Sequence, residues 1–579
     1  MVYNYYIIMF QSLFLLCTIY AFVPTDWVPQ STIQRSHSKT FNILLRQENL
    51  DILESELSRR SDPKSQAYTK WLRPSEINNI IHPHDNRDII DYLHQREIYC
   101  TDNIDSLTCT SSIGHLESTF STIFEKYTHF TGKVHYSNRG YHMTVPSAIE
   151  QDISMILGFR EFPNVYKSLL TRPINDGELY ISPESIKTLY NVKSYNYSKL
   201  SSQAVVEFLN DECFNIDDLN QFMKDNRLAN VSITKDHFWG SCDPHTDNPD
   251  IEATLDIQYQ NGVNNNSVMY YVSVSDWLYQ FANKLYMAPN PPSVVSMSYG
   301  WAEWDQCDAA VMPSCLFSSN AEIYTKRTNV EFMKLGLRGI TLVASSGDAG
   351  APGRTDENCN SGTVGRVLNP AFPASSPWVL SVGGTIIENA TKLITDIPIC
   401  KQMNCIGGGD EVNCNLDRCG WTSGGGFSNY FNRPWWQINA SSQYLNSSAK
   451  FPPAAYFNKN GRIYPDISLV SHNFIIRANG QYGTVDGTSA SGPSVSAMVS
   501  ILNNLRLSKG KATLGPINAL LYHIEQQCDS CFNDIIEGSN NSSEMSSCKY
   551  GYQATTGYDA VYGLGTPNFD AIAHYVDSL

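Results

Sequence analysis

From about residue 180 onward the chain alternates between short apolar runs and segments with helical spacing. The runs 294–298, 339–344 and 379–382 are rich in aliphatic residues, which is typical of buried strands. Strands that alternate with helices along the sequence predict a parallel α/β sheet. Active sites of such sheets gather beyond the carboxyl ends of the strands. Asp348 follows the second run within the motif Ser-Gly-Asp, so we expect it at that edge.

A domain boundary is expected near residues 172–180, because 579 residues are too many for one ordinary domain. Pro, Asn, Asp and Gly residues make this stretch flexible. Ser182 and Pro183 then supply a helix N-cap with proline at the first helical position. The catalytic part is therefore assigned to residues 177–579.

The region before that boundary, residues 23–176, shows no catalytic grouping and is interpreted as an accessory domain or a propeptide. Apolar residues from Leu44 to Leu57 recur with helical spacing, which predicts a helix through that stretch. Cys100 and Cys109 are close enough in sequence for a local disulfide.

The N-terminal run from Tyr5 to Ala21 carries no charge and is short for a membrane span. Its position favours a secretory signal peptide, assigned to residues 1–22, over an uncleaved anchor. No later segment is long and apolar enough to span a bilayer, so we expect no stable membrane insertion after the signal is removed. The expected route is the secretory pathway, ending in the lysosome or outside the cell. Eight N-glycosylation sequons agree with this route, at Asn196, Asn230, Asn265, Asn389, Asn439, Asn446, Asn540 and Asn541.

The cysteines point to disulfides. Cys17 lies in the signal region, and fourteen of the fifteen cysteines remain, an even number. The polar stretch 391–422 holds four of them, with a spacing open to a zinc site or to disulfides. In a secreted chain a disulfide-stapled loop is the favoured interpretation.

The net charge of −16 argues against a nucleic-acid partner, because nothing offsets repulsion by the phosphates. The oligomeric state is left open.

Ser489 has the setting of a displayed nucleophile. It lies in Gly-Thr-Ser-Ala-Ser, followed by Gly-Pro and an apolar segment, so its hydroxyl is expected uncovered at a helix N-terminus. This motif fits a protease assisted either by histidine or by carboxylates. No histidine after residue 180 has a His-Gly-Thr-His type of context, which disfavours a histidine triad; they are His237, His245, His472, His523 and His574.

Two carboxylates offer a better base. The stretch from Glu252 to Tyr259 predicts a helix, which puts Glu252 and Asp256 four residues apart on one face. A solvated helix face would be the ordinary interpretation of this spacing. The apolar neighbours Ala253, Leu255 and Ile257 favour burial instead, and a buried pair would share protons and separate its pKa values.

Several separated motifs then occur in one order along the chain: SDPKSQAYTKWLRPSEI, EATLD, SSGDAG, PAFPASSPWVLSVGGT, SGGGFSNYFNRP, YPDISLV, GTSASGP and GYDAVYGLGTPNF. Together they resemble the sedolisin family, the serine-carboxyl peptidases. The resemblance covers nearly the whole chain after the signal. It implies a subtilisin-like α/β domain, with a parallel sheet flanked by helices, behind an N-terminal α/β propeptide domain of ferredoxin-like form.

The resemblance also implies roles for four residues. Ser489 would be the nucleophile, Glu252 the general base and then acid, Asp256 the residue that orients Glu252, and Asp348 part of the oxyanion hole. A carboxylate base works best near its own pKa, so acidic action is expected. An aspartic acid donates a hydrogen bond to an oxyanion only when it is protonated, which points the same way.

A C-terminal calcium site is implied by the same resemblance. Asp534 and Asp559 would give side-chain oxygens, and Ile535, Thr555 and Gly557 would give main-chain carbonyls. Such hard oxygen donors suit one structural calcium ion. Without the resemblance, a glycine-rich turn with two surface aspartates would be the preferred interpretation.

The expected activity is acid peptide hydrolysis through an acyl-enzyme, with release of tripeptides from free N-termini favoured by the resemblance. The partners that the resemblance implies are peptide or protein substrates and the chain's own propeptide. An endopeptidase is the nearest alternative, and a catalytically silent secreted glycoprotein a remote one.

Other features stay open. Asp486 stands three residues before Ser489 and either perturbs local pKa values or faces solvent. Trp301 and Trp304 either shape a subsite or pack structurally. The stretch 391–422 could cover one end of the cleft, and Cys359 could pair with Cys531 or Cys548.

Overall fold

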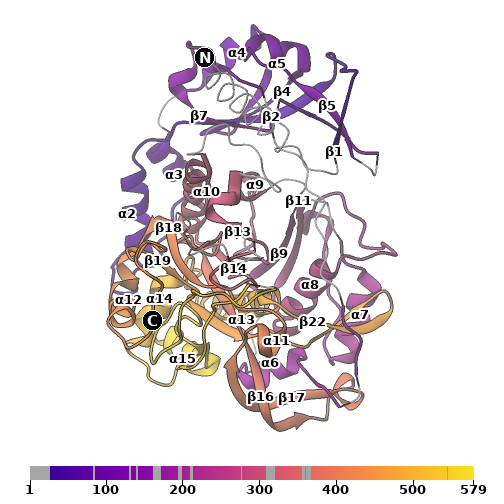
Figure 1. Cartoon of the computed structure of the whole chain (residues 1–579), viewed down its shortest axis with the longest axis vertical. Coiled ribbons are helices and arrows are strands. Elements are labelled where there is room, and N and C mark those ends of the chain that lie inside the picture. The colour runs from indigo at the N-terminus through magenta and orange to yellow at the C-terminus, as the bar shows by residue number, and fades with distance from the viewer. Residues whose placement is uncertain are drawn as a thin grey trace, which may run out of the picture. The chain divides into compact units, whose positions relative to one another are not determined.

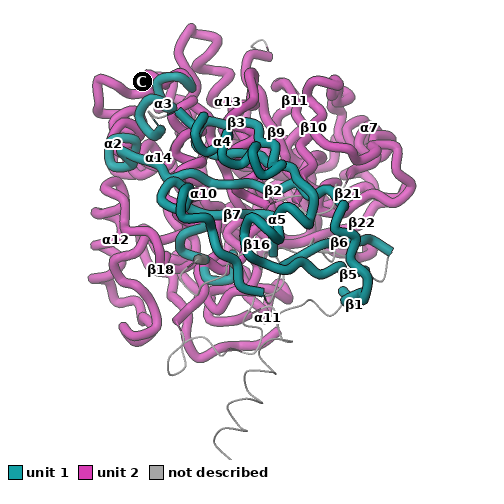
Figure 2. The backbone as a smooth tube through the Cα atoms, turned by 90° about the horizontal axis from the view of Figure 1, so that it is seen from above, with its two compact units in different colours: residues 1–53, 74–164, 304–324 teal, residues 54–73, 165–303, 325–579 magenta. Residues whose placement is uncertain are grey.

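The computed structural model describes residues 27–82, 85–129, 132–138, 141–160, 171–175, 177–193, 199–208, 213–274, 277–307, 320–354, 359, 367–543 and 545–579. The expected signal peptide, residues 1–22, and the sequon at Asn196 lie outside these ranges. The chain forms two compact units (Figure 2), one of residues 1–53, 74–164 and 304–324, the other of residues 54–73, 165–303 and 325–579. This division follows packing, so the domain limits at residues 22 and 176 stay predictions. No helix within the described ranges combines the length and apolarity that a bilayer span requires.

The first unit contains two antiparallel sheets. Its elements are β1 (Trp27–Gln30), β2 (Ser38–Leu45), α3 (Pro74–Ile81), α4 (Arg87–His94), β3 (Tyr99–Asp102), β4 (Ser106–Ser112), α5 (Ile113–Thr119), β5 (Glu125–His129), β6 (Val134–Ser137) and β7 (Ile153–Leu157); α2 (Leu50–Ser61) begins in it. The larger sheet has the order β3-β4-β2-β7 and the smaller one β1-β5-β6. The strands of the larger sheet and their helices follow the order βαββαβ, with β5 and β6 of the smaller sheet inserted before β7. This is the predicted ferredoxin-like arrangement.

One local prediction in this unit is wrong. Leu44 and Leu45 end strand β2, where they pair with β4 and β7, and the helix begins only at Leu50. Both side chains are buried, so sheet pairing outweighs the local helical spacing. The predicted disulfide between Cys100 and Cys109 is confirmed and joins directly paired positions of β3 and β4.

The second unit is built on one large sheet (Figure 1). The described residues give it nine strands: β10 (Phe238–Trp239), β11 (Val268–Val274), β9 (Ser202–Phe208), β12 (Val294–Met297), β14 (Thr341–Ser345), β16 (Leu380–Ile394), β17 (Asn404–Asn413), β8 (Leu179–Tyr180) and β20 (Ile467–Val470), which pairs with β16. Neighbours from β10 to β16 are parallel, and β16 pairs antiparallel with β17. The predicted parallel sheet and its three apolar strands β12, β14 and β16 are thereby confirmed.

Helices and short strands complete this unit. The helices are α6 (Pro183–Leu189), α7 (Ile216–Asp225), α8 (Ile251–Val263), α9 (Leu278–Met287), α10 (Asn320–Leu337), α11 (Leu416–Cys419), α12 (Ile438–Leu445), α13 (Thr488–Ser508), α14 (Asn518–Glu525) and α15 (Phe569–Ser578). Of these, α10 begins in the first unit. The paired strands are β13 (Trp301–Ala302) with β15 (Ala371–Phe372), β18 (Gly426–Asn432) with β19 (Gly461–Tyr464), β21 (Phe474–Ala478) with β22 (Gln481–Val485), and β23 (Phe532–Asn533) with β24 (Thr566–Pro567). Helices α8 and α13 pack against each other and against the central strands.

The cysteine-rich stretch 391–422 is more regular than the predicted loop. Most of it is the β16–β17 hairpin followed by α11. Its cysteines pair as Cys400–Cys405 and Cys414–Cys419, which confirms disulfides in place of zinc. Cys359 pairs with Cys548, while Cys531 pairs with Cys528.

Candidate active site

Helix α8 carries the two predicted carboxylates. Asp250 caps it, because its side-chain oxygen accepts a hydrogen bond from the amide of Ala253 at 2.9 Å. Glu252 lies in the first turn and Asp256 one turn later, as the four-residue spacing predicts. Their exposed fractions are 8% and 0%, so the predicted burial is confirmed and a solvated helix face is excluded.

Ser489 lies in the first turn of α13, close behind a glycine in the left-handed region, Gly487 with φ of 120°. The serine hydroxyl donates a hydrogen bond to the carbonyl of Ser298 at 3.5 Å and also contacts Glu252. Glu252, Asp348 and Ser489 line one pocket of about 540 Å³. Residues 252, 348 and 489, far apart in sequence, are thus brought together at the carboxyl ends of the central strands.

Electrostatics favour protonated carboxyls in this site. Burial raises the pKa of Glu252 well above its ordinary value, and the neighbouring Asp256 raises it further. The hydrogen bond from Ser489 opposes these effects. Burial likewise raises the pKa of Asp256, against the hydrogen bond that it accepts from the Ser298 hydroxyl. The site is therefore built to hold protons on its carboxyls at acidic pH.

Comparison with known proteins places this site in a family. Residues 25–162 match the Pro-kumamolisin, activation domain, and residues 246–546 match the Subtilase family. Physarolisin of Physarum polycephalum is 35% identical over 577 residues, which cover 97% of this chain and 98% of that protein. The chain belongs to the sedolisin family.

Two further likenesses agree with this assignment to the sedolisins. Tripeptidyl-peptidase 1 of Rattus norvegicus is 29% identical over 590 residues, covering 95% of this chain and 93% of its own. The solved structure of Pseudomonas sedolisin, a serine-carboxyl proteinase, has the same fold with a TM-score of 0.50 and 22% identity, over 71% of this chain and 99% of its own. The chain is therefore a serine peptidase of the sedolisin type, with its own activation domain and with peptides or proteins as substrates.

Two polar residues of this sedolisin site escaped sequence analysis. Ser298 follows β12 and donates to both oxygens of Asp256, at 2.9 and 2.7 Å. Glu207 lies near the end of β9 and accepts a hydrogen bond of 2.9 Å from the hydroxyl of Tyr299. Burial raises the pKa of Glu207, and the charge of Asp256 adds to this. A polar residue at a strand's carboxyl end was the available signal, the same one that identified Asp348.

Asp486 has a different role from either that the sequence suggested. It is largely buried and lies at the end of β22, where it accepts the amide of Asn473 at 2.7 Å. Its other oxygen forms an ion pair of 2.5 Å with Arg172, and His472 lies 3.1 Å away. Arg172 also forms a two-bond antiparallel bridge with Thr484 of β22. Asp486 therefore fastens the start of the 172–180 segment to the strand that leads to Ser489.

The structure also places the two tryptophans, the cysteine-rich stretch and one of the sequons. Trp301 lines the pocket with Ser489, and so does Gly420 from the cysteine-rich stretch. Trp304 belongs to the first unit. Of the sequons, Asn540 is fully buried and its side-chain amide bonds the carbonyls of Gly425 and Ala560, so it cannot carry a glycan in the folded chain.

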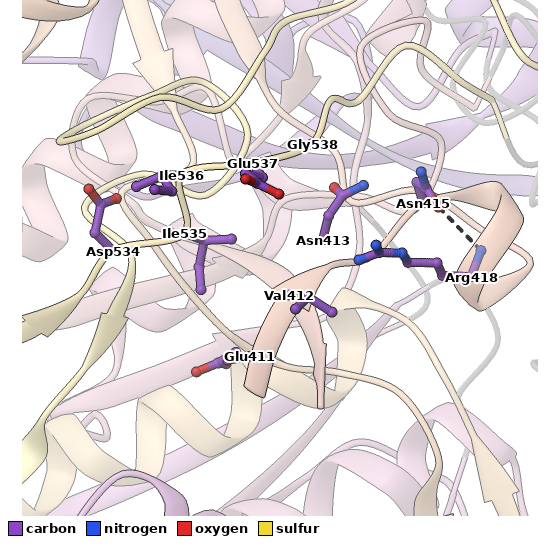
Figure 3. A pocket seen from close by; sticks show the side chains of 10 residues that line it. All are labelled: Glu411, Val412, Asn413, Asn415, Arg418, Asp534, Ile535, Ile536, Glu537 and Gly538. Atoms are coloured by element: carbon purple, nitrogen blue, oxygen red, sulfur yellow. Dashed lines mark hydrogen bonds between the residues drawn. The ribbon is translucent and has the colours of Figure 1, made fainter. Parts of the chain in front are cut away.

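The predicted calcium ligands come together on C-terminal loops. The amide of Gly557 donates to Asp534 at 2.7 Å, and the amide of Thr555 donates to Asp559 at 3.0 Å. Asp534 and Ile535 also border a pocket of about 440 Å³, with Asn415 and Arg418 on its other side (Figure 3).

The donor set fits a hard cation. Burial raises the pKa of Asp559 to about 8 and also raises that of Asp534, so a cation bound between them would favour their charged forms. The described side chains form no cluster of three His, Cys, Asp or Glu suited to a metal. A cation here would thus depend on two carboxylates together with main-chain carbonyls, which is a calcium-type donor set.

Proposed function

We propose that this sedolisin acts at acidic pH with Ser489 as nucleophile, Glu252 as general base and then acid, and Asp348 in the oxyanion hole. The observation that carries the proposal is the placement of Ser489 and the buried Glu252 in one pocket, with Asp256 one turn further along the helix. The raised pKa of Glu252 matches a base that works in acid, because proton transfer is most efficient near the pKa of the catalyst.

The proposed reaction begins at Ser489. Ser489 Oγ attacks the peptide carbonyl carbon, its proton passes to Glu252, and the carbonyl electron pair moves onto oxygen. Protonated Asp348 donates a hydrogen bond to that oxyanion. Glu252 then gives its proton to the leaving amine, which breaks the C–N bond and leaves an acyl-enzyme. Water, deprotonated by Glu252, releases the acid product and restores the serine.

Release of tripeptides from free N-termini is the proposed mode. It is supported by relatives that carry the name tripeptidyl-peptidase 1, with 29% identity over almost the whole chain. The test is mass spectrometry of the products from one peptide in N-free and N-blocked forms at pH 4–5. Tripeptides from the free form alone would support the proposal, and internal cuts in both forms would show an endopeptidase.

Ser489→Ala should abolish hydrolysis and self-processing, and retained activity would refute the assigned nucleophile.

One structural calcium ion is proposed at Asp534 and Asp559, with carbonyls of Ile535, Thr555 and Gly557. The bound cation would neutralise the two carboxylates and stabilise the loops, with no part in the chemistry. Metal analysis should find one calcium per chain, and chelation should lower the melting temperature. A metal-free protein with an unchanged melting profile would refute the site.

The secretory route, with a lysosomal or extracellular destination, is proposed as well. Six disulfides among the described cysteines support an oxidising compartment. Glycosidase-sensitive mobility of protein made in eukaryotic cells is the test, and an unglycosylated protein retained in the cytosol would contradict the proposal.

A further inference from the structure

Thr488, the residue before the nucleophile, makes two hydrogen bonds to one oxygen of Asp348. Its main-chain amide donates to Asp348 Oδ1 at 2.7 Å, and its hydroxyl approaches the same oxygen at 2.8 Å. The amide of Gly347 donates to the Thr488 hydroxyl oxygen at 3.1 Å. The Thr488 hydroxyl thus accepts a hydrogen bond from Gly347 and donates its own proton to Asp348.

The framework around Thr488 is rigid. Its exposed fraction is 1%, and its carbonyl accepts hydrogen bonds from the hydroxyls of Ser345 and Ser491, both at 2.8 Å. Ser345 ends strand β14 and Ser491 belongs to α13. Thr488 is therefore held from both the strand that precedes Asp348 and the helix that carries Ser489.

Two donors at Oδ1 decide where a proton on Asp348 can sit. A proton on Oδ1 would point at the N–H and the O–H of Thr488, which both donate to that oxygen. The protonated acid must therefore carry its proton on Oδ2. A Cβ atom at Gly487 would lie 2.9 Å from that Oδ2, so only glycine leaves the space beside it open. The left-handed φ of Gly487 also favours glycine there.

We propose that Thr488 is a positioning residue for Asp348, whose hydroxyl and amide occupy Oδ1 so that the acid proton is held on Oδ2 for the oxyanion. This inference rests on the proposed role of Asp348. It also explains why the Gly-Thr-Ser motif contains a threonine. Thr488 would position Asp348 in the oxyanion hole, in addition to forming part of the turn before Ser489.

The test compares Thr488→Val, which keeps the shape and removes the hydroxyl, with Thr488→Ser, which keeps the hydroxyl. Both are measured on the acid-activated full chain with a peptide substrate and with the matching peptide aldehyde. The aldehyde carbon bonds to Ser489 Oγ, the serine proton passes to Glu252, and the former carbonyl oxygen then occupies the oxyanion position. Aldehyde affinity thus reports on the oxyanion hole, and KM reports on ordinary peptide binding.

Thr488→Val should lower kcat by about 10²-fold, the effect typical of losing an oxyanion donor, with KM nearly unchanged. Its affinity for the aldehyde should fall by a similar factor, while Thr488→Ser should stay within a few-fold of the parent. Equal kcat and aldehyde affinity in Thr488→Val and the parent would overturn the inference. So would equal losses in the valine and serine variants, because the methyl group would then be the important part.

If Thr488→Val does not fold, Thr488→Cys carries the test, since the thiol keeps the size and is a weak donor. It should lose kcat and aldehyde affinity together, and full retention of both would overturn the inference. An inactive parent chain, or activity that survives Ser489→Ala, would instead refute the proposed function. The two failures are therefore distinguishable.

Discussion

Glu303 makes the stability of the catalytic unit depend on pH in a direction that can be worked out. Its exposed fraction is 1%, and one carboxyl oxygen accepts the amide of Asn429 at 2.8 Å while the other bonds the hydroxyl of Ser428. Burial raises its pKa from 4.5 to about 7, against these hydrogen bonds. The folded chain therefore keeps this carboxyl protonated at pH values where the unfolded chain has lost the proton.

The sign and size follow from linkage. Between pH 4.5 and about 7 the native state binds more protons than the unfolded state at this group, so stability falls as pH rises. The contribution is fully present below pH 4.5 and is lost by about pH 7. A pKa that is higher by roughly 2.5, at about 1.36 kcal/mol for each pH unit, corresponds to about 3 kcal/mol.

Glu303→Gln removes this titration. We expect its free energy of unfolding, relative to the parent, to improve by about 3 kcal/mol between pH 4.5 and pH 7. Urea unfolding of the full chain at both pH values measures this, with Ser489→Ala in each protein to prevent self-digestion. A chain of two units need not unfold in one step. The transition of the catalytic unit is therefore followed by both fluorescence and circular dichroism, and the two curves should coincide.

The difference between the two pH values is the decisive quantity. The amide that Glu303→Gln introduces cannot reproduce both hydrogen bonds of the carboxyl, but that loss is the same at both pH values and cancels. Glu150→Gln, at an exposed position of the first unit, serves as the control and should show no such change. If the parent and the Glu303→Gln protein differ by the same free energy at pH 4.5 and pH 7, the reasoning is refuted.

Three further predictions concern the site and the segment near residue 172. Asp256→Asn removes a charge that raises the pKa of Glu252. We expect kcat to fall by roughly 10²–10⁴-fold and the acid limb of the pH–rate profile to move to lower pH. An unmoved limb would contradict the electrostatic effect of Asp256 on Glu252. Ser298→Ala removes the hydroxyl that donates to the carboxyl of Asp256, so kcat should fall with little change in KM. An unchanged kcat would exclude Ser298 from the site. Asp486→Ser breaks the ion pair with Arg172, so limited proteolysis at neutral pH should cut residues 171–175 faster, and an equal rate would show that the pair does not hold this segment.

Much of the site could be predicted because its signals are local. Glu252 and Asp256 depend only on one helix and a four-residue spacing, and Ser489 depends on one short motif. Asp348 needed the further rule that polar residues after parallel strands meet at one edge. The alternation of strands and helices was enough for that rule.

Other features could not be predicted, because they depend on pairing between distant segments. Ser298 lies 191 positions from Ser489. Its place after an apolar strand was a signal for the site, but its partner Asp256 could not be predicted from the local sequence. Leu44 and Leu45 fit a helix by spacing, yet the neighbouring strands decide their conformation. The disulfide partner of Cys359 could not be predicted either, because sequence does not determine disulfide connectivity.

The buried carboxyls connect the stability of this sedolisin with its proposed chemistry. Burial raises the pKa of Glu207, Glu303 and Glu411, as it does for Glu252 and Asp256. Each such group stabilises the fold in acid and loses that contribution as pH rises. In the proposed reaction Asp348 must be protonated, so these groups favour the fold under the same acidic conditions that the proposed reaction requires. Transfer to neutral pH should then weaken the fold and the reaction together, since both depend on protons held by buried acids.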